Sequence, residues 1–221
     1  MGVFSSGSIV RADTPNERPK VAVIGCGGQG TGDGRRATNY GDIVAVCDVD
    51  TSHSAYAKAA YTRRMATPGR DVKIDVYDDY RAIIDRSDID AIICGTVDHW
   101  HVKISAEALK SGKDVYCEKP LTLTVDEGRI ISKVAQETDR ILQVGTQQRS
   151  DPRFLQAVAI AHSGRLGKIE KVTVGLNHNP FSKPLPAVAP PKTLNWERWK
   201  GPTADRSEEH TSELQSRETT S

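Results

Sequence analysis

Short apolar runs alternate with longer polar stretches along most of this chain. Five runs lack regular polar alternation and are rich in Val and Ile, as in strands buried on both faces; they are Val21–Ile24, Ile43–Cys47, Ile89–Gly95, Asp114–Cys117 and Ile141–Gly145. Val72–Val76 is a weaker strand candidate. The sequence therefore predicts a sheet of short, buried strands, separated widely enough for helices to lie between them.

The stretches between the runs predict helices over Arg35–Tyr40, Ser52–Met65, Tyr80–Arg86, Trp100–Ser111 and Thr124–Thr138. Thr51 or Ser52 is the expected N-cap of the second helix, and Thr124 with Glu127 has the spacing of a capping box. Strands that alternate with helices predict an α/β fold, in which a doubly wound parallel sheet carries helices on both faces.

The pattern changes after residue 150. Asp151–Arg165 predicts a helix, and Lys168–Gly175 alternates polar and apolar residues, as in a strand with one solvated face. Pro180–Pro191 is proline-rich, which favours an extended and exposed segment. We therefore expect a second structural unit, with a different kind of sheet, to begin here.

Composition excludes several classes of function. The 221 residues carry a net charge of +1 with acidic and basic residues interspersed, so there is no electrostatic footprint for nucleic acid. No apolar run approaches the ~20 residues that cross a bilayer, so no membrane partner is expected. The histidines lack zinc-type spacing, and no metal site is expected. The cysteines are interpreted as small buried residues, not as disulfides or nucleophiles; they are Cys26, Cys47, Cys94 and Cys117.

A glycine-rich turn follows the first predicted strand. Gly25, Gly27 and Gly30 form G-x-G-x-x-G directly after the apolar run, in the sequence KVAVIGCGGQGTGDG. The first glycine permits a tight turn, the second lets backbone approach a pyrophosphate, and the third lets the next helix pack closely. Gly28 and Gln29 lie inside the same loop and are further candidates for cofactor binding.

The glycine motif alone is weak evidence, but Asp48 strengthens it, because an acidic residue at the end of the second strand, about 20 residues after the glycines, is typical of dinucleotide-binding sites. A carboxylate here accepts hydrogen bonds from both ribose hydroxyls of NAD and repels the 2′-phosphate of NADP, so NAD is the expected cofactor. The alternative is a structural turn with an unrelated surface aspartate.

Polar clusters also follow the later strands. They are Thr96–His101, Glu118–Pro120 and Gly145–Arg149. Ligands of parallel α/β sheets bind at the carboxyl ends of the strands, so these clusters are expected to line one cleft together with the glycine loop.

The glycine motif, Asp48, Thr96–His101 and Glu118-Lys119-Pro120, in this order, resemble the Gfo/Idh/MocA oxidoreductases, the family of glucose–fructose oxidoreductase and inositol dehydrogenase. The resemblance extends from about Lys20 to Gly201. It implies a Rossmann sheet followed by a second, α+β domain with a mainly antiparallel sheet. Val97 departs from the family, which often has proline at this position.

The resemblance places Lys119 beside the nicotinamide and the substrate hydroxyl, often with a cis bond before Pro120. An ammonium there stabilises developing alkoxide charge and relays a proton, although a surface ion pair with Glu118 is the alternative. The remaining candidates for cofactor contact are Thr96, His99, His101, Glu118 and Gln147. Arg149 is a candidate for binding substrate, with a structural ion pair as an equal alternative. Trp100 is interpreted as a packing residue.

These inferences give four expected segments: a leader remnant or linker (1–18), the Rossmann domain (19–147), the start of a substrate-binding domain (148–205) and a tail (206–221). Val10-Arg11-Ala12 resembles a signal-peptide cleavage region, so the protein is expected in the cytoplasm or, if that leader is real, exported to the periplasm. Arg206–Ser216 matches the translation of a sequencing adapter, and the native sequence is expected to end near Asp205.

The leading functional hypothesis is an NAD-dependent oxidoreductase that moves hydride between nicotinamide and a carbinol of a sugar, cyclitol or related polyol. One alternative is an NAD-dependent glycoside hydrolase of the same family, and another is a non-catalytic dinucleotide-binding fragment. The family's second catalytic group, a histidine in an Asp-x-x-x-His helix, would lie beyond Asp205, so this chain is expected to bind NAD without turnover. The resemblance also implies a homo-oligomer formed through the second domain.

Overall fold

The structure is a computed structural model that describes residues 18–69, 71–175 and 188–201. The described residues fall into two compact units, which are treated separately below. The first contains residues 18–69, 71–144 and 192–201, and the second contains residues 145–175 and 188–191. The sequence placed 192–201 in the second domain, whereas the structure packs them with the first. The expected leader (1–18, save its last residue) and tail (206–221) lie outside the described residues.

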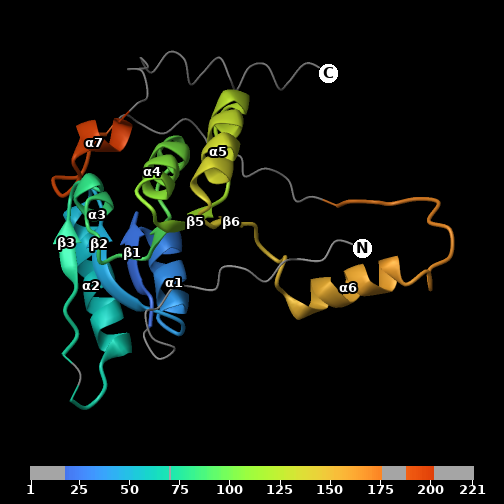
Figure 1. Ribbon diagram of the computed structural model, residues 1–221, viewed down its shortest axis with the longest axis horizontal. Helices are drawn as coiled ribbons and strands as arrows, with labels where there is room; N and C mark the ends of the chain where they lie inside the picture. Colours follow the sequence, from blue (N-terminus) through green and yellow to red (C-terminus); the bar gives the residue numbers. More distant parts are fainter. Residues whose placement is uncertain (1–17, 70, 176–187, 202–221) are drawn as a thin grey trace. The chain divides into compact units, whose positions relative to one another are not determined.

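A six-stranded sheet in the order β3-β2-β1-β4-β5-β6 forms the centre of the first unit (Figure 1). Its strands are β1 (Lys20–Ile24), β2 (Asp42–Cys47), β3 (Asp75–Tyr77), β4 (Ala91–Cys94), β5 (Asp114–Glu118) and β6 (Leu142–Gly145). Every pairing from β3 to β5 is parallel. The chain order reverses between β1 and β4, which is the point where Rossmann sheets bind their ligand. The expected fold class is confirmed.

Helices connect the strands and cover both faces of the sheet. They are α1 (Gly28–Ala37), α2 (Thr51–Met65), α3 (Arg81–Ile84), α4 (Asp98–Lys110) and α5 (Val125–Thr138), with α7 (Trp196–Lys200) near the end of the unit. The predicted capping box of α5 is present: Glu127 N donates to Thr124 Oγ1, and the Glu127 carboxylate accepts from Thr124 N at 3.0 Å.

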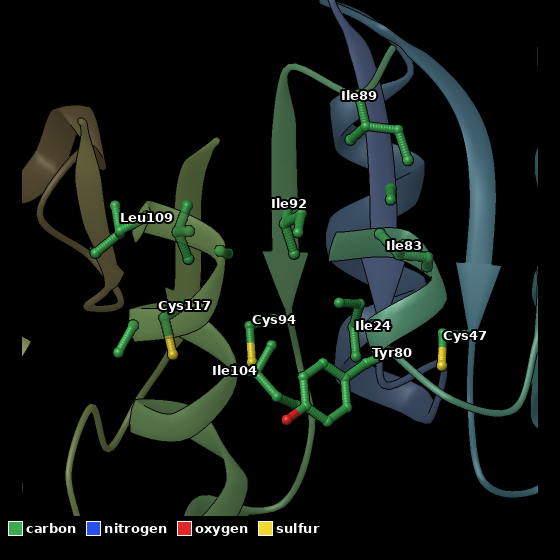
Figure 2. Packing of buried hydrophobic residues seen from close by; sticks show 14 of the residues in the cluster. Ile24, Cys47, Tyr80, Ile83, Ile89, Ile92, Cys94, Ile104, Leu109 and Cys117 are labelled. Carbon is green, nitrogen blue, oxygen red and sulfur yellow. The ribbon is translucent and has the colours of Figure 1, made fainter. Parts of the chain in front are cut away.

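The strands divide the core between the two faces. Val21 and Val23 of β1 pack with α2, whereas Ala22 and Ile24 pack with α3, α4 and α5. Figure 2 shows this second cluster, in which β4 contributes Ile92 between the helices and the neighbouring strands. Such continuous burial explains the apolar runs of the sequence. All four cysteines are buried and free, as interpreted from the sequence.

Helix α1 differs from the sequence prediction, which began a helix at Arg35. The helix begins seven residues earlier, at Gly28, inside the glycine-rich loop. Glycine is a poor helix former, but close packing here requires it. A Cβ at Gly34 would meet the Tyr61 hydroxyl, which donates to Gly30 O at 3.3 Å. Tertiary contact therefore overrides local propensity.

The N-cap of α2 also differs. Asp50, not Thr51 or Ser52, caps the helix, and its side chain accepts from Ser52 N at 2.9 Å and from Ser52 Oγ at 2.6 Å. The Ser52 hydrogen bonds, the leading cause, lower the pKa of Asp50, because they favour its charged form.

The second unit contains α6 (Pro152–His162), which is capped by Asp151 as its sequence suggests. The strand predicted over Lys168–Gly175 is absent there: these residues are exposed and pair with no described strand. Alternating polarity marks a strand only when an adjacent strand accepts its hydrogen bonds. The expected extended segment Pro180–Pro191 lies mostly outside the described residues. Within the described ranges, no helix has the length and apolar character to span a membrane.

Candidate active site

Three glycines interlock at the switch point between β1 and β4. Gly25 has φ +84°, and a Cβ built on it would lie 2.5 Å from Gly95 C. A Cβ on Gly95 would lie 2.7 Å from Gly30 Cα, and one on Gly30 would collide with Gly25 O. The turn after β1, the start of α1 and the end of β4 therefore pack backbone against backbone. The sequence motif included Gly25 and Gly30 but missed Gly95, whose only signal is its place at the end of an apolar run.

Gly27 and Gly28 have no such neighbours among the residues that the structure describes. A Cβ at either position meets nothing within 4 Å, and Gly27, the N-cap of α1, has φ −64°, which any residue adopts. The protein itself gives no steric reason for glycine here. A ligand that approaches the backbone at the helix N-terminus supplies one, and the free N–H groups suit a pyrophosphate. The residues present therefore fit a dinucleotide.

Asp48 lies after β2, as predicted, and fixes the glycine loop. Its Oδ2 accepts from Cys26 N at 2.5 Å and its Oδ1 accepts from Asp50 N at 2.8 Å, while His53 Nδ1 lies 3.7 Å from Oδ2. The side chain remains 9% exposed. A carboxylate has about four acceptor positions, so these two hydrogen bonds leave capacity for ribose hydroxyls.

The polar cluster after β4, Thr96–His101, has some side chains at the edge of the sheet and others in the protein interior. Thr96 is half-buried beside the glycine interlock. His101 is 1% exposed, with Nδ1 2.6 Å from Pro120 O and Nε2 3.1 Å from Thr96 O. A direct contact between His101 and a cofactor, which the resemblance implied, is incompatible with this burial.

Residues 193–201, here called the return segment, bring the chain back to the carboxyl edge of the sheet. Thr51 N donates to Thr193 O at 3.0 Å, and Asn195 N donates to Val49 O at 2.8 Å. These hydrogen bonds attach the segment directly after β2, next to Asp48. The sequence placed this segment in another domain and gave no signal of the contact.

Helix α7, within the return segment, packs against the start of α4. Trp199 O lies 2.8 Å from His99 Nε2 and accepts from Trp100 Nε1 at 3.0 Å, and Arg198 pairs with Asp78 at 2.9 Å. The packing interpretation of Trp100 is confirmed. His99 stays half-buried at the edge, but one of its ring nitrogens faces protein rather than open space.

Glu118 ends β5 with its carboxylate turned into the protein. It is 4% exposed, and its Oε1 accepts from Gln29 Nε2 and from the Tyr116 hydroxyl, each at 3.3 Å. Gln29 also contacts both oxygens of Asp33 at 3.2 Å. Burial and the charge of Glu118 raise the pKa of Asp33, and burial, with the charges of Asp33 and Glu118, raises the pKa of Tyr116 to about 12. This network, which the sequence did not predict, links β5 to the cofactor end of α1.

Lys119 is exposed directly after this buried group, and the Lys119–Pro120 bond is cis, as the resemblance implied. Its backbone N donates to Glu118 Oε2 at 3.1 Å. Among the described residues, its ammonium has no ion-pair partner, so the alternative of a surface pair with Glu118 finds no support. The arrangement gives one cation at the carboxyl edge of the sheet, between β4 and β6 in strand order.

Gln147 and Arg149 belong to the second unit, where both are exposed in a turn that precedes α6. Their roles toward cofactor and substrate stay predictions. No group of three or more potential metal ligands occurs among the residues described.

A parallel sheet in this order, with a glycine interlock after β1 and a carboxylate after β2, defines a dinucleotide-binding Rossmann domain. The sequence model of the family described as "Oxidoreductase family, NAD-binding Rossmann fold" matches residues 19–146. The chain belongs to this family, the Gfo/Idh/MocA oxidoreductases, and NAD is the cofactor that the family binds.

Curated relatives include inositol 2-dehydrogenase of Klebsiella pneumoniae, 35% identical over 67% of this chain and 42% of the relative. Among solved structures, myo-inositol 2-dehydrogenase of Lactobacillus plantarum is 28% identical, with a TM-score of 0.59 over 69% of this chain and 43% of that one. Scyllo-inositol dehydrogenase of Lactobacillus casei, solved with NAD(H) and scyllo-inositol, shares the fold at 22% identity, with a TM-score of 0.58 over 68% of this chain and 43% of that one. The chain spans about two fifths of the length of these relatives.

Proposed function

We propose that the protein is an NAD-dependent dehydrogenase that oxidises a carbinol of a cyclitol or related polyol. The observation that supports this best is Lys119, an exposed ammonium at the carboxyl edge of an NAD-binding sheet. It has no ion-pair partner among the described residues, and the neighbouring Glu118 is engaged by Gln29 and Tyr116. The substrate class comes from the relatives, which are named inositol dehydrogenases.

The chain's own residues divide the work. The N–H groups at the start of α1, left open by Gly27 and Gly28, bind the pyrophosphate, and Asp48 binds the adenosine ribose. When bound, NAD supplies the hydride acceptor at nicotinamide C4. Lys119 lies beside the substrate hydroxyl, and its ammonium stabilises the negative charge that develops on the oxygen. The hydroxyl proton moves to Lys119 as the ammonium gives one of its own protons to the second proton-transfer group or to water, so one proton leaves the site for each hydride transferred.

The second unit enters this proposal as the beginning of the substrate-binding domain, with Arg149 as a donor to polyol hydroxyls. The second proton-transfer group, the Asp-x-x-x-His histidine of the resemblance, belongs to the same proposal, and no Asp-x-x-x-His occurs in these 221 residues. Self-association through the second domain also belongs to it. Turnover is therefore assayed in the protein expressed from its complete natural reading frame.

Two measurements test the proposal. Calorimetry on the 221-residue chain is expected to show NAD binding in preference to NADP. The full reading frame, given NAD and a panel of inositols and sugars, is expected to produce NADH, followed at its absorbance band. Release of sugar from a glycoside without net NADH would instead identify the NAD-dependent hydrolase. Binding of NAD without turnover of any polyol would identify a dinucleotide sensor.

A further inference from the structure

His101 joins two loops that carry the candidate active site. It lies in the first turn of α4, and its ring is 1% exposed. Its Nδ1 is 2.6 Å from Pro120 O, in the loop after β5, and its Nε2 is 3.1 Å from Thr96 O, in the loop after β4. The two carbonyls belong to separate strand ends, and this one ring lies between them.

The chemistry of the contact is directional. Both partners are carbonyl oxygens, which only accept hydrogen bonds, so the ring must donate. A neutral imidazole has a single N–H and donates to one carbonyl at a time, whereas the imidazolium donates to both. In either form the ring is enclosed by these two backbone groups, and it has no free nitrogen to offer a ligand.

Lys119 is held from both sides by this arrangement. The residue before it, Glu118, is bound by Gln29 of α1 at 3.3 Å, and the residue after it, Pro120, is bound by His101 of α4. The backbone of Lys119 is thereby fixed to the two helices that follow β1 and β4. These are the strands that flank the switch point of the sheet.

We propose that His101 is a positioning residue with two separable tasks. Through Pro120 it fixes the backbone from which Lys119 reaches the substrate, and through Thr96 it fixes the loop after β4, in which Thr96 is a candidate for cofactor contact. The proposal rests on the function proposed above. It replaces the direct cofactor contact that the sequence had suggested for this histidine.

Two substitutions separate the tasks, because side-chain amides copy one ring nitrogen each. Counted along covalent bonds, the amide nitrogen of Asn stands where Nδ1 stands, and that of Gln stands where Nε2 stands. His101→Asn therefore keeps the donor to Pro120 and loses the donor to Thr96. His101→Gln keeps the donor to Thr96 and loses the donor to Pro120.

The two variants are expected to affect different properties: His101→Gln mainly kcat, and His101→Asn mainly NAD affinity. His101→Gln lowers kcat about tenfold or more with little change in NAD affinity, since a misplacement of about 1 Å can cost 10²-fold in rate. His101→Asn weakens NAD binding about tenfold, the worth of one hydrogen bond, and keeps more of kcat. Amide hydrogen exchange, measured in the 221-residue chain, rises around Thr96 in the Asn variant and around Lys119 in the Gln variant.

Leu109→Ala is the matched control. Leu109 is fully buried in the same helix, about 12 Å further along its axis at 1.5 Å per residue. Its loss destabilises the unit without the crossed pattern, so the three variants are compared at temperatures where each is equally folded. Equal effects of Asn and Gln on kcat, NAD affinity and exchange, matching those of Leu109→Ala, would overturn the proposal. If the wild type oxidises no polyol, the proposed function fails, and the exchange pattern still decides whether His101 ties both loops.

Discussion

Alanine at Gly27 and alanine at Gly30 should affect different properties of the protein, although the two positions lie three residues apart. At Gly27 a Cβ meets no atom of the described residues within 4 Å and φ is −64°, so the backbone accepts alanine without strain. The poorer N-cap costs about 0.5–1 kcal/mol. Loss of unfolded-state freedom returns about 0.4–1 kcal/mol. The free energy of unfolding should therefore change by less than about 0.5 kcal/mol.

The loss at Gly27 should appear in NAD binding. A methyl group there keeps the pyrophosphate from the first N–H groups of α1, and hydrogen bonds to charged groups are worth about 1.5–3 kcal/mol each. Binding should weaken about ten- to a hundredfold, because about 1.4 kcal/mol corresponds to a factor of ten.

At Gly30 the fold itself is affected. The added Cβ collides with the carbonyl oxygen of Gly25, which cannot rotate away as a side chain does. Overpacking of this kind costs about 3 kcal/mol, and the helix propensity of alanine returns about 1 kcal/mol. A net loss of about 2 kcal/mol lowers Tm by about 4–8 °C in a protein of this size.

The assays are thermal unfolding without ligand and calorimetry with NAD, and Gly32→Ala serves as the control. Gly32 lies in the same helix with open space around its Cβ position, so its variant should keep NAD affinity and raise Tm by about 2–4 °C, because alanine adds about 1 kcal/mol of helix propensity without a clash. Wild-type NAD affinity in Gly27→Ala would show that the pyrophosphate binds elsewhere. A wild-type Tm in Gly30→Ala would refute the interlock with Gly25.

Three further predictions follow from named side chains. Asp48→Ala should weaken NAD binding at least tenfold, because it removes the acceptor of the ribose hydroxyls and the anchor of the glycine loop. It should also reduce the preference for NAD over NADP, because the carboxylate no longer repels the 2′-phosphate. Calorimetric affinities equal to those of the wild type would overturn the ribose assignment. Lys119→Ala, in the complete reading frame, should lower kcat about a hundredfold or more while NAD affinity stays near wild type; a wild-type rate removes Lys119 from the mechanism. Arg86 hydrogen-bonds to Asp88 and holds its pKa at about 2, below its unfolded value, so this stabilisation is present above about pH 4 and is lost as the pH falls towards 2. Arg86→Ala should therefore destabilise the chain to urea at pH 7, by a margin that narrows between pH 4 and 2; a constant margin contradicts the assignment.

The sheet was predictable because its signal is local and repeated. Each buried strand needs apolar residues on both faces, and the runs that satisfy this requirement became β1, β2, β4 and β5. The fifth run became β6, an edge strand in which Gln143 is exposed and which follows Ile141, 48% exposed, so the expected burial on both faces was wrong there. The capping box at Thr124 is likewise encoded within four residues. Helix α1 was not predictable from propensity, because the glycines that weaken it in isolation are required by Gly25, Gly95 and Tyr61, which lie far away in the sequence.

The location of the candidate site at the sheet edge was predictable from the sequence, but the orientation of its side chains was not. A residue that follows a parallel strand lies at the ligand edge, which located Asp48, Thr96 and Lys119 there. Position along the chain does not say which way a side chain points. Glu118 and His101 follow the same rule and turn inward, because Gln29 and the two loop carbonyls offer them partners that only the folded chain brings together.

The return segment affects where the chain tolerates insertions. The stretch between β6 and the return segment is anchored to the first unit at both ends: at one end by β6 of the sheet, and at the other by the hydrogen bonds of the return segment to Val49 and Thr51. The entropic cost of closing such a loop, expressed as free energy, rises by only about 0.6 kcal/mol for each doubling of the loop length. Insertions in this stretch therefore leave both anchor points nearly as stable as before. Insertions of very different length between β6 and the return segment can therefore be accommodated, while the edge of the cofactor site in the Rossmann unit stays unchanged.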